Sequence, residues 1–163
     1  MKKWLRRIFW SLVVILVVAQ LIPVPRTNPP VDASKTLAAT TSVPPQVAAI
    51  IERSCQDCHS SLTKWPWYSH VAPASWLLYF DVKGARTMMN LSEWGTYPVR
   101  RQDTRLGDIV EQITSGNMPD SKYLLIHRNS KLSDQDKKTL TDWADASRKN
   151  LGYKKEPAPV ASH

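Results

Sequence analysis

The only two cysteines of this 163-residue chain lie in one short segment, Cys55-Gln56-Asp57-Cys58-His59. Cys-x-x-Cys-His is the attachment pattern of c-type haem. On a helical turn, two thiols three residues apart can each add to one vinyl group of the same porphyrin. The neighbouring histidine then supplies an imidazole as an axial iron ligand. The spacing therefore predicts one covalently bound haem c per chain, with Cys55 and Cys58 as attachment sites and His59 as an iron ligand.

Other uses of the cysteine pair are a disulfide, a thioredoxin-like redox site or part of a zinc site. A thioredoxin-like pair normally follows a strand in a βαβ unit, and no such strand is indicated. Zinc would need two further ligands, and the histidines besides His59 are His70, His127 and His163. The haem interpretation is favoured because the cysteines occur together with a possible export signal.

The export signal is the apolar run from Ile8 to Ile22, which follows four basic residues and is closed by Pro23 and Pro25. We expect residues 1–25 to be an uncleaved signal-anchor that crosses the bacterial inner membrane once. The alternative is a secretory signal peptide cut after Ala19. Both interpretations place the remainder on the periplasmic, extracytoplasmic side.

The net charge of +8 suggests nucleic-acid binding, but its distribution argues against that partner. Removing the five basic residues that precede the first acidic residue, Asp32, leaves 17 basic against 14 acidic residues. The basic excess therefore belongs to the N-terminus, where membrane topology explains it. A small basic cluster is expected to be a solvated helix face, or else a partner or propionate site: Arg100, Arg101 and Arg105.

Prolines, threonines and serines are frequent in residues 26–43, and this composition predicts a partly extended linker without a core of its own. Residues 44–150 are expected to form an all-α, cytochrome c-like domain, because alternating strand patterns are absent and helical patterns are clear. Pro44 and Pro45 are suited to start the helix that delivers the cysteines. Residues 151–163 are expected to be a flexible tail.

A second axial ligand is sought among the methionines and histidines. Met118 is predicted, because it lies in a loop with Pro119 directly after an amphipathic helix that Gly116 should end. A His/Met pair raises the reduction potential. His70 is the alternative sixth ligand. The remaining candidates are expected to be structural residues, in the core or hydrogen-bonded: Met88, Met89 and His127.

The last helix is predicted from Ser133 as its N-cap and from Asp134 and Asp136 near the positive end of its dipole. Its apolar face should carry Leu140 and Trp143, with Trp143 packing against the first helix of the domain.

The order of these motifs resembles that of class I cytochromes c, in which the first and last helices cross and a loop methionine closes the haem crevice. A closer resemblance is to the bacterial haem-binding domain family, whose members are small exported proteins with one Cys-x-x-Cys-His motif. The resemblance covers residues 43–148. The segments that carry it are 53–60, 65–69, 71–77, 90–94 and 116–119.

Aromatic residues are concentrated in residues 65–79, and Trp65 and Trp67 are expected to wall the haem crevice. A sharper hypothesis is that one of these indoles donates its N–H to a haem propionate. Pro66 or Pro73 is expected to offer the backbone carbonyl that orients the His59 ring.

The leading functional hypothesis is one-electron transfer with redox proteins in or near the membrane, without catalysis of its own. The second is a haem sensor or small-ligand binder with an open or labile sixth position, and weak peroxidase activity is compatible with it. The third is a thiol-redox or metal-delivery protein that uses the cysteines without haem.

Overall fold

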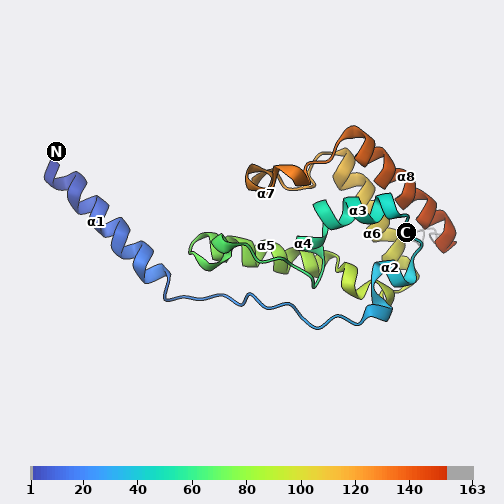
Figure 1. Cartoon of the computed structure of the whole chain (residues 1–163), viewed down its shortest axis with the longest axis horizontal. Helices are drawn as coiled ribbons and strands as arrows, with labels where there is room; N and C mark the ends of the chain where they lie inside the picture. The colour runs from blue at the N-terminus through green and yellow to red at the C-terminus, as the bar shows by residue number, and fades with distance from the viewer. Residues whose placement is uncertain (1, 154–163) are drawn as a thin grey trace, which may run out of the picture. The chain divides into compact units, whose positions relative to one another are not determined.

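The computed structural model describes residues 2–153, and every regular element within them is helical, as the sequence predicts. The predicted tail beyond Tyr153 lies outside the described residues. The described chain divides into two compact units. Unit 1 contains residues 2–30 and 57–90, and unit 2 contains residues 31–56 and 91–153; Figure 1 labels their α-helices.

Unit 1 is built from four helical elements and the connections between them. Its longer helices are α1 (Lys2–Ala19) and α5 (Ala74–Met88), and the short ones are α4 (Gln56–His59), which starts at the unit boundary, and the 3₁₀ helix η2 (Trp67–His70). Helix α5 begins within the aromatic segment and continues beyond it. Two large apolar side chains of α5, Leu77 and Phe80, are 52% and 63% exposed.

Among residues 2–153, no helix has the length and apolar content required to cross a membrane. The predicted transmembrane anchor over residues 1–25 is therefore not supported. The physical reason is that α1 contains all four early basic residues and ends at Ala19. The apolar residues Leu21 and Ile22, which the prediction counted in the span, lie beyond the helix.

The segment after α1 lies along the rest of unit 1 and is called here the strap, residues 20–28. At its first residue, the Gln20 side chain accepts from the Ala72 N–H at 2.9 Å and donates to the Ala72 carbonyl at 3.1 Å. The Trp76 indole N–H donates to the Ile22 carbonyl at 2.9 Å. At the last residue, Asn28 Nδ2 donates to the Thr63 carbonyl at 2.9 Å. The strap is therefore held by directional hydrogen bonds along its length.

The interior of unit 1 is more polar than apolar. Within the described part of the unit, the buried apolar side chains are Ala72, Val82 and Met89. The buried polar side chains outnumber them and are Ser60, Ser61, Thr63, Ser69, Ser75 and Asn90.

Unit 2 has an apolar core between helices from both of its chain segments. Its first segment holds η1 (Ala33–Lys35), α2 (Leu37–Thr40) and α3 (Pro45–Ser54). Its second holds η3 (Leu91–Thr96), α6 (Val99–Thr114), α7 (Ser121–Ile126), η4 (Arg128–Ser130) and α8 (Asp134–Leu151).

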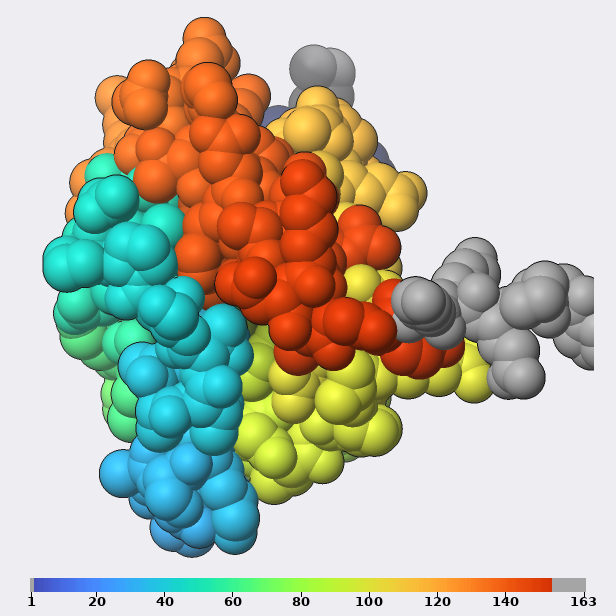
Figure 2. Space-filling view, turned by 90° about the vertical axis from the view of Figure 1, so that its right-hand side faces the viewer, coloured from blue at the N-terminus to red at the C-terminus, as the bar shows by residue number. Residues whose placement is uncertain are grey.

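Helix α8 packs on both α6 and α3 (Figure 1). Figure 2 shows α8, in red, bordered by the blue-to-cyan segment that includes α2 and α3. Leu106 of α6 and Leu140 of α8 are each 1% exposed. Trp143 is buried, as predicted, and its indole N–H donates to the Ser42 carbonyl, just before α3, at 3.0 Å. The predicted pairing of the first and last helices of the domain is thus confirmed.

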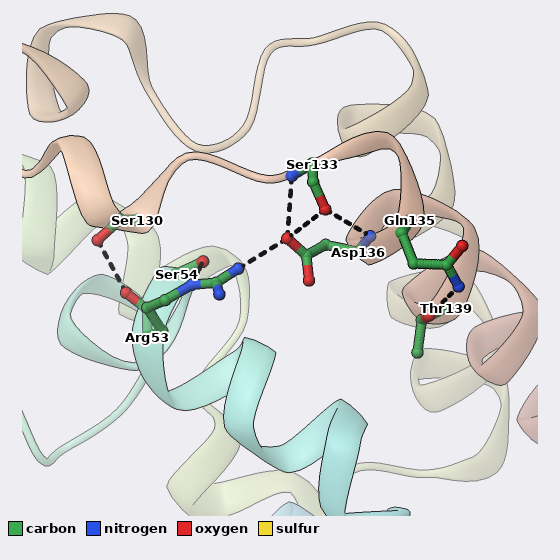
Figure 3. A network of polar contacts seen from close by, with 7 residues as sticks. All are labelled: Arg53, Ser54, Ser130, Ser133, Gln135, Asp136 and Thr139. Atoms are coloured by element: carbon green, nitrogen blue, oxygen red, sulfur yellow. Dashed lines mark hydrogen bonds and ion pairs between the residues drawn. The ribbon is translucent and has the colours of Figure 1, made fainter.

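The start of α8 has the predicted N-cap, in the form of a complete capping box. Ser133 Oγ accepts from the Asp136 N–H at 3.1 Å, and Asp136 Oδ2 accepts from the Ser133 N–H at 2.9 Å. Arg53, in the last turn of α3, donates to the same carboxylate oxygen at 2.9 Å (Figure 3). Ser130 Oγ donates to the Arg53 carbonyl at 2.8 Å. This network joins the end of α3 to the start of α8.

The predicted linker contains more structure than its composition suggests. Leu37 is buried in unit 2 at 5% exposure, and η1 and α2 pack against η3. The approach is close at Gly95, where a Cβ would lie 2.8 Å from Thr40 Cγ2 and 3.2 Å from Lys35 Cα. Only glycine leaves room for this contact. Composition predicted an extended spacer because it does not reveal that a distant segment, η3, packs against this one.

The strap generates a first prediction. Gln20→Ala removes both hydrogen bonds to Ala72, whose backbone is then left without that partner, at a cost of about 1–3 kcal/mol. We expect faster hydrogen exchange at the Ala72 amide, measured by NMR or mass spectrometry. The matched control is Gln46→Ala, on the exposed side of α3. Equal exchange rates at Ala72 in the two variants would show that the strap does not hold this loop.

The capping network generates a second prediction, on pH. Hydrogen bonds from the Ser133 N–H and hydroxyl, and then the one from Arg53, lower the pKa of Asp136 below 3.8. A lowered folded-state pKa stabilises the fold above the unfolded pKa, and this stabilisation disappears as the pH falls through the folded value. Asp136→Asn should therefore cost roughly 1 kcal/mol near pH 6, and the difference from wild type should shrink below pH 3.8.

Urea unfolding of both proteins across this pH range provides the measurement. Asp142→Asn is the control, because Asp142 forms an exposed ion pair with Lys138 on the same helix. Surface pairs of this kind contribute little. A cost of Asp136→Asn that stays constant down to acid pH would contradict the argument.

Candidate functional site

The Cys-x-x-Cys-His motif lies at the junction of two helices. Pro44 and Pro45 start α3 as predicted, with Val47 and Ile50 on its buried face. The helix ends at Ser54, and the Cys55 N–H caps it by donating to the Ile51 carbonyl at 2.9 Å. Helix α4 follows at once and carries the remainder of the motif. Neither thiol is in a disulfide, and both side chains are partly exposed.

The two cysteines belong to different units. Cys55 is in unit 2, two residues after Arg53, whose side chain and carbonyl are both engaged in the network of Figure 3. Cys58 and His59 are in unit 1. Contacts within unit 2 therefore fix the backbone just before Cys55, and contacts within unit 1 determine the environment of His59.

The imidazole of His59 is oriented by a backbone carbonyl. Its Nδ1 lies 3.2 Å from the carbonyl oxygen of Met89, at the C-terminal end of α5. Because a carbonyl can only accept, Nδ1 carries the proton in this contact, and in the neutral ring Nε2 then keeps its lone pair. This arrangement is typical of metal-ligating histidines. The expectation that Pro66 or Pro73 supplies the carbonyl was wrong; Met89 does so.

Burial lowers the pKa of His59, and hydrogen bonding to the carbonyls of Met89 and Ala85 only partly opposes the shift. The neutral imidazole is consequently favoured. Neutral imidazole is also the form that binds a metal ion.

The loop that follows His59 is attached to α5 through Arg86. Its Nε donates to the Ser60 carbonyl at 2.8 Å, and its Nη2 donates to Thr63 Oγ1 at 2.8 Å and to Asn28 Oδ1 at 2.7 Å. Sequence reasoning missed Arg86 and Asn28. Neither stands in a recognisable motif, and only the folded path of the chain brings them to the loop.

The aromatic segment differs between its two tryptophans. Trp65 is partly buried, and its indole N–H is buried without a hydrogen-bond partner among the described residues. Buried indole N–H groups normally find an acceptor, so this donor suits an acceptor on a bound group. Trp67 is 79% exposed, which leaves its predicted place in a crevice wall without support from burial. Burial, followed by the nearby charges of Asp57 and Cys58, raises the pKa of Tyr68.

Met118 lies in the predicted loop after α6. That helix ends at Thr114, and Gly116 adopts the positive φ of 75° that the turn requires. The Met118 N–H donates to the Gln112 carbonyl at 3.1 Å, which fixes the backbone, while the side chain is 41% exposed. The thioether therefore lies outside the apolar core of unit 2.

The other ligand candidates have different surroundings. His70 is exposed on η2 in unit 1. The His127 ring stacks on Tyr123 with centroids 4.2 Å apart, which fits the predicted structural role. Met89 is buried as expected, whereas Met88 is 57% exposed and the prediction that it packs in the core was wrong.

The predicted basic cluster is more engaged than a solvated face. Arg105 pairs with Asp108 at 2.6 Å, and the Arg101 guanidinium lies 4.0 Å from the ring centroid of Tyr97. The Nε atom of Arg105 is buried without a hydrogen-bond partner among the described residues. No group of three or more histidine, cysteine, aspartate or glutamate side chains in residues 2–153 could hold a metal ion by itself.

Comparison with known proteins gives two matches. A cytochrome c peroxidase of Escherichia coli (strain K12) is 25% identical over 113 residues, which cover 66% of this chain and 24% of the relative. The chain thus spans about a quarter of the length of that curated relative. No solved structure matches. The haem-binding domain family matches over residues 14–146. Because that match extends over most of the 163 residues, the chain belongs to the haem-binding domain family.

Proposed function

We propose that this chain is a single-haem c-type cytochrome that transfers one electron at a time. The haem is attached covalently through Cys55 and Cys58, and His59 binds the iron through Nε2. The observation that carries the proposal is the hydrogen bond from His59 Nδ1 to Met89, in a chain of a haem-binding family. This hydrogen bond orients the neutral imidazole of His59, the residue that directly follows Cys58 in the sequence.

The composition of unit 1 supports a bound apolar cofactor. Three apolar side chains are buried in its described part, while several large ones are exposed, among them Leu62, Phe80 and Met88. A unit with so little buried apolar surface gains little from its own core. A porphyrin supplies the missing apolar surface, and the buried Trp65 N–H is suited to one of its propionates.

Met118 is proposed as the second axial ligand. Its support is the anchored loop backbone and the accessible sulfur. Thioether ligation favours ferrous iron and raises the potential. His70 remains the alternative, because its side chain is exposed and belongs to the same unit as His59.

One-electron transfer is the role that such coordination suits best. A bound haem supplies a ferric/ferrous couple. The chain's own residues set the potential and keep the ligands in place in both states. The proposed partners are redox proteins on the extracytoplasmic side. Export is supported by the basic residues that precede the apolar part of α1 and by the end of that helix at Ala19.

A second candidate function is a ligand-binding or weakly peroxidatic haem protein. The specific observation in its favour is the similarity to a protein named as a cytochrome c peroxidase. With His59 as one axial ligand, this function requires a sixth position that is open or labile, so that an exogenous ligand could occupy it. The two candidates differ in the strength with which the sixth position is occupied.

Covalent attachment is tested with Cys55→Ala/Cys58→Ala. In a host that assembles c-type cytochromes, the wild-type chain should keep haem stain on a denaturing gel and the double variant should lose it. We also expect the amides of α5 to lose protection from hydrogen exchange in the double variant, more than those of α6 and α8. Ser115→Ala, an exposed change in unit 2, is the control. A wild-type protein without covalent haem would refute the proposal.

The sixth ligand is tested with Met118→Ala and His70→Ala. If Met118 binds iron, its loss should abolish the iron–thioether charge-transfer band, lower the reduction potential and let carbon monoxide bind faster. His70→Ala should change none of these properties. The opposite pattern would assign His70, and rapid carbon monoxide binding by the unmutated ferrous protein would favour the ligand-binding function.

A further inference from the structure

Arg86 and Asn28 both contact the loop that begins at His59, and they also contact each other. From their contacts we propose that they form a positioning clamp, which holds the iron-ligating histidine by fixing the residues after it. This inference rests on the proposed haem ligation by His59. It also assigns a role to the strap, a segment that composition marked only as part of an anchor and a linker.

Helix α5 holds the histidine at two points. The Met89 carbonyl accepts from His59 Nδ1, and Arg86 Nε donates to the carbonyl of Ser60, the next residue along the chain. Arg86 lies in the last turn of α5, and Met89 is the C-cap residue of the same helix. The ring and the peptide that follows it are thereby fixed to the same helical end. Rotation of the ring would break the Nδ1 contact, and displacement of the backbone after it would break the Arg86 contact.

The loop from Asp57 to Lys64 is also closed on itself. Thr63 Oγ1 donates to the Asp57 carbonyl at 2.6 Å, and the Lys64 N–H donates to Asp57 Oδ1 at 3.1 Å. Cys58 and His59 lie inside this closed loop. Thr63 Oγ1 is in addition the acceptor for Arg86 Nη2. The guanidinium therefore acts on the closure of the loop as well as on Ser60.

The strap completes the clamp through Asn28. Its side-chain oxygen accepts from Arg86 Nη2 at 2.7 Å, and its nitrogen donates to the Thr63 carbonyl at 2.9 Å. The amide thus bridges α5 and the loop. Residues far upstream of the motif therefore belong to the environment of the iron ligand.

The chemistry of the clamp requires an arginine. Nε and Nη2 point to different acceptors from one planar group, a fork geometry that a lysine ammonium cannot reproduce. Arg86→Lys should keep the positive charge but lose this division of donors. The clamp hypothesis therefore predicts that Arg86→Lys resembles Arg86→Ala, whereas a purely electrostatic role predicts that it resembles the wild type.

The experiment compares Arg86→Ala, Arg86→Lys, Asn28→Ala and Thr63→Val in the full chain. Thr63→Val conserves shape and removes only the hydroxyl, so it remains informative if the Arg86 variants fold poorly. The control is Arg148→Ala, which breaks the ion pair with Asp103 between α8 and α6. Two readouts are used: hydrogen exchange at the Leu62 and Lys64 amides, which donate to Ser60 and Asp57, and the spin state and potential of the bound haem.

We expect each clamp variant to accelerate exchange at these two amides about tenfold or more. We also expect a larger high-spin fraction of the ferric protein and a shifted potential, with Arg148→Ala unchanged in all three. Unchanged spin state and potential in Thr63→Val and Arg86→Lys would overturn the positioning role. A protein without haem would refute the proposed function instead, and hydrogen exchange would still report whether the clamp exists.

Discussion

The hydrogen bond between His59 Nδ1 and the Met89 carbonyl is the contact on which the rest of the proposed site depends. A carbonyl acceptor fixes both the tautomer and the direction of the ring, so Nε2 is left as the basic atom. This single contact requires the C-terminal end of α5 to lie beside α4. Arg86 and the strap can be understood as devices that hold these two segments in that arrangement.

Sequence patterns predicted the features that depend on neighbouring residues. The N-cap at Ser133, the turn at Gly116 and the buried stripe of α8 all follow from local rules of helix ends and helical periodicity. The motif at Cys55 and His59 is likewise local. Such features need no knowledge of which distant segment packs against them.

The features that escaped prediction depend on the folded path of the chain. The carbonyl that orients His59 belongs to a residue 30 positions away, and every non-terminal residue carries a carbonyl, so no pattern could identify Met89. Arg86 resembled any solvated arginine on a helix. Leu37 seemed isolated in a polar segment, although it is buried, and the neighbouring residues Lys35 and Thr40 pack closely against Gly95 of η3. In each case the role of the residue depends on a contact with a distant part of the chain, which the local sequence does not reveal.

The two units differ in what stabilises them, and this difference bears on function. In unit 2, apolar residues such as Leu106, Leu140 and Trp143 fill the core. In the described part of unit 1, buried serines, Thr63 and Asn90 outnumber the buried apolar side chains, and directional hydrogen bonds specify the loops. Hydrogen bonds fix geometry but contribute little net stability. Apolar burial contributes much of the stability but is not directional. A unit that positions a ligand precisely and lacks an apolar core is therefore suited to a cofactor that brings the apolar surface itself.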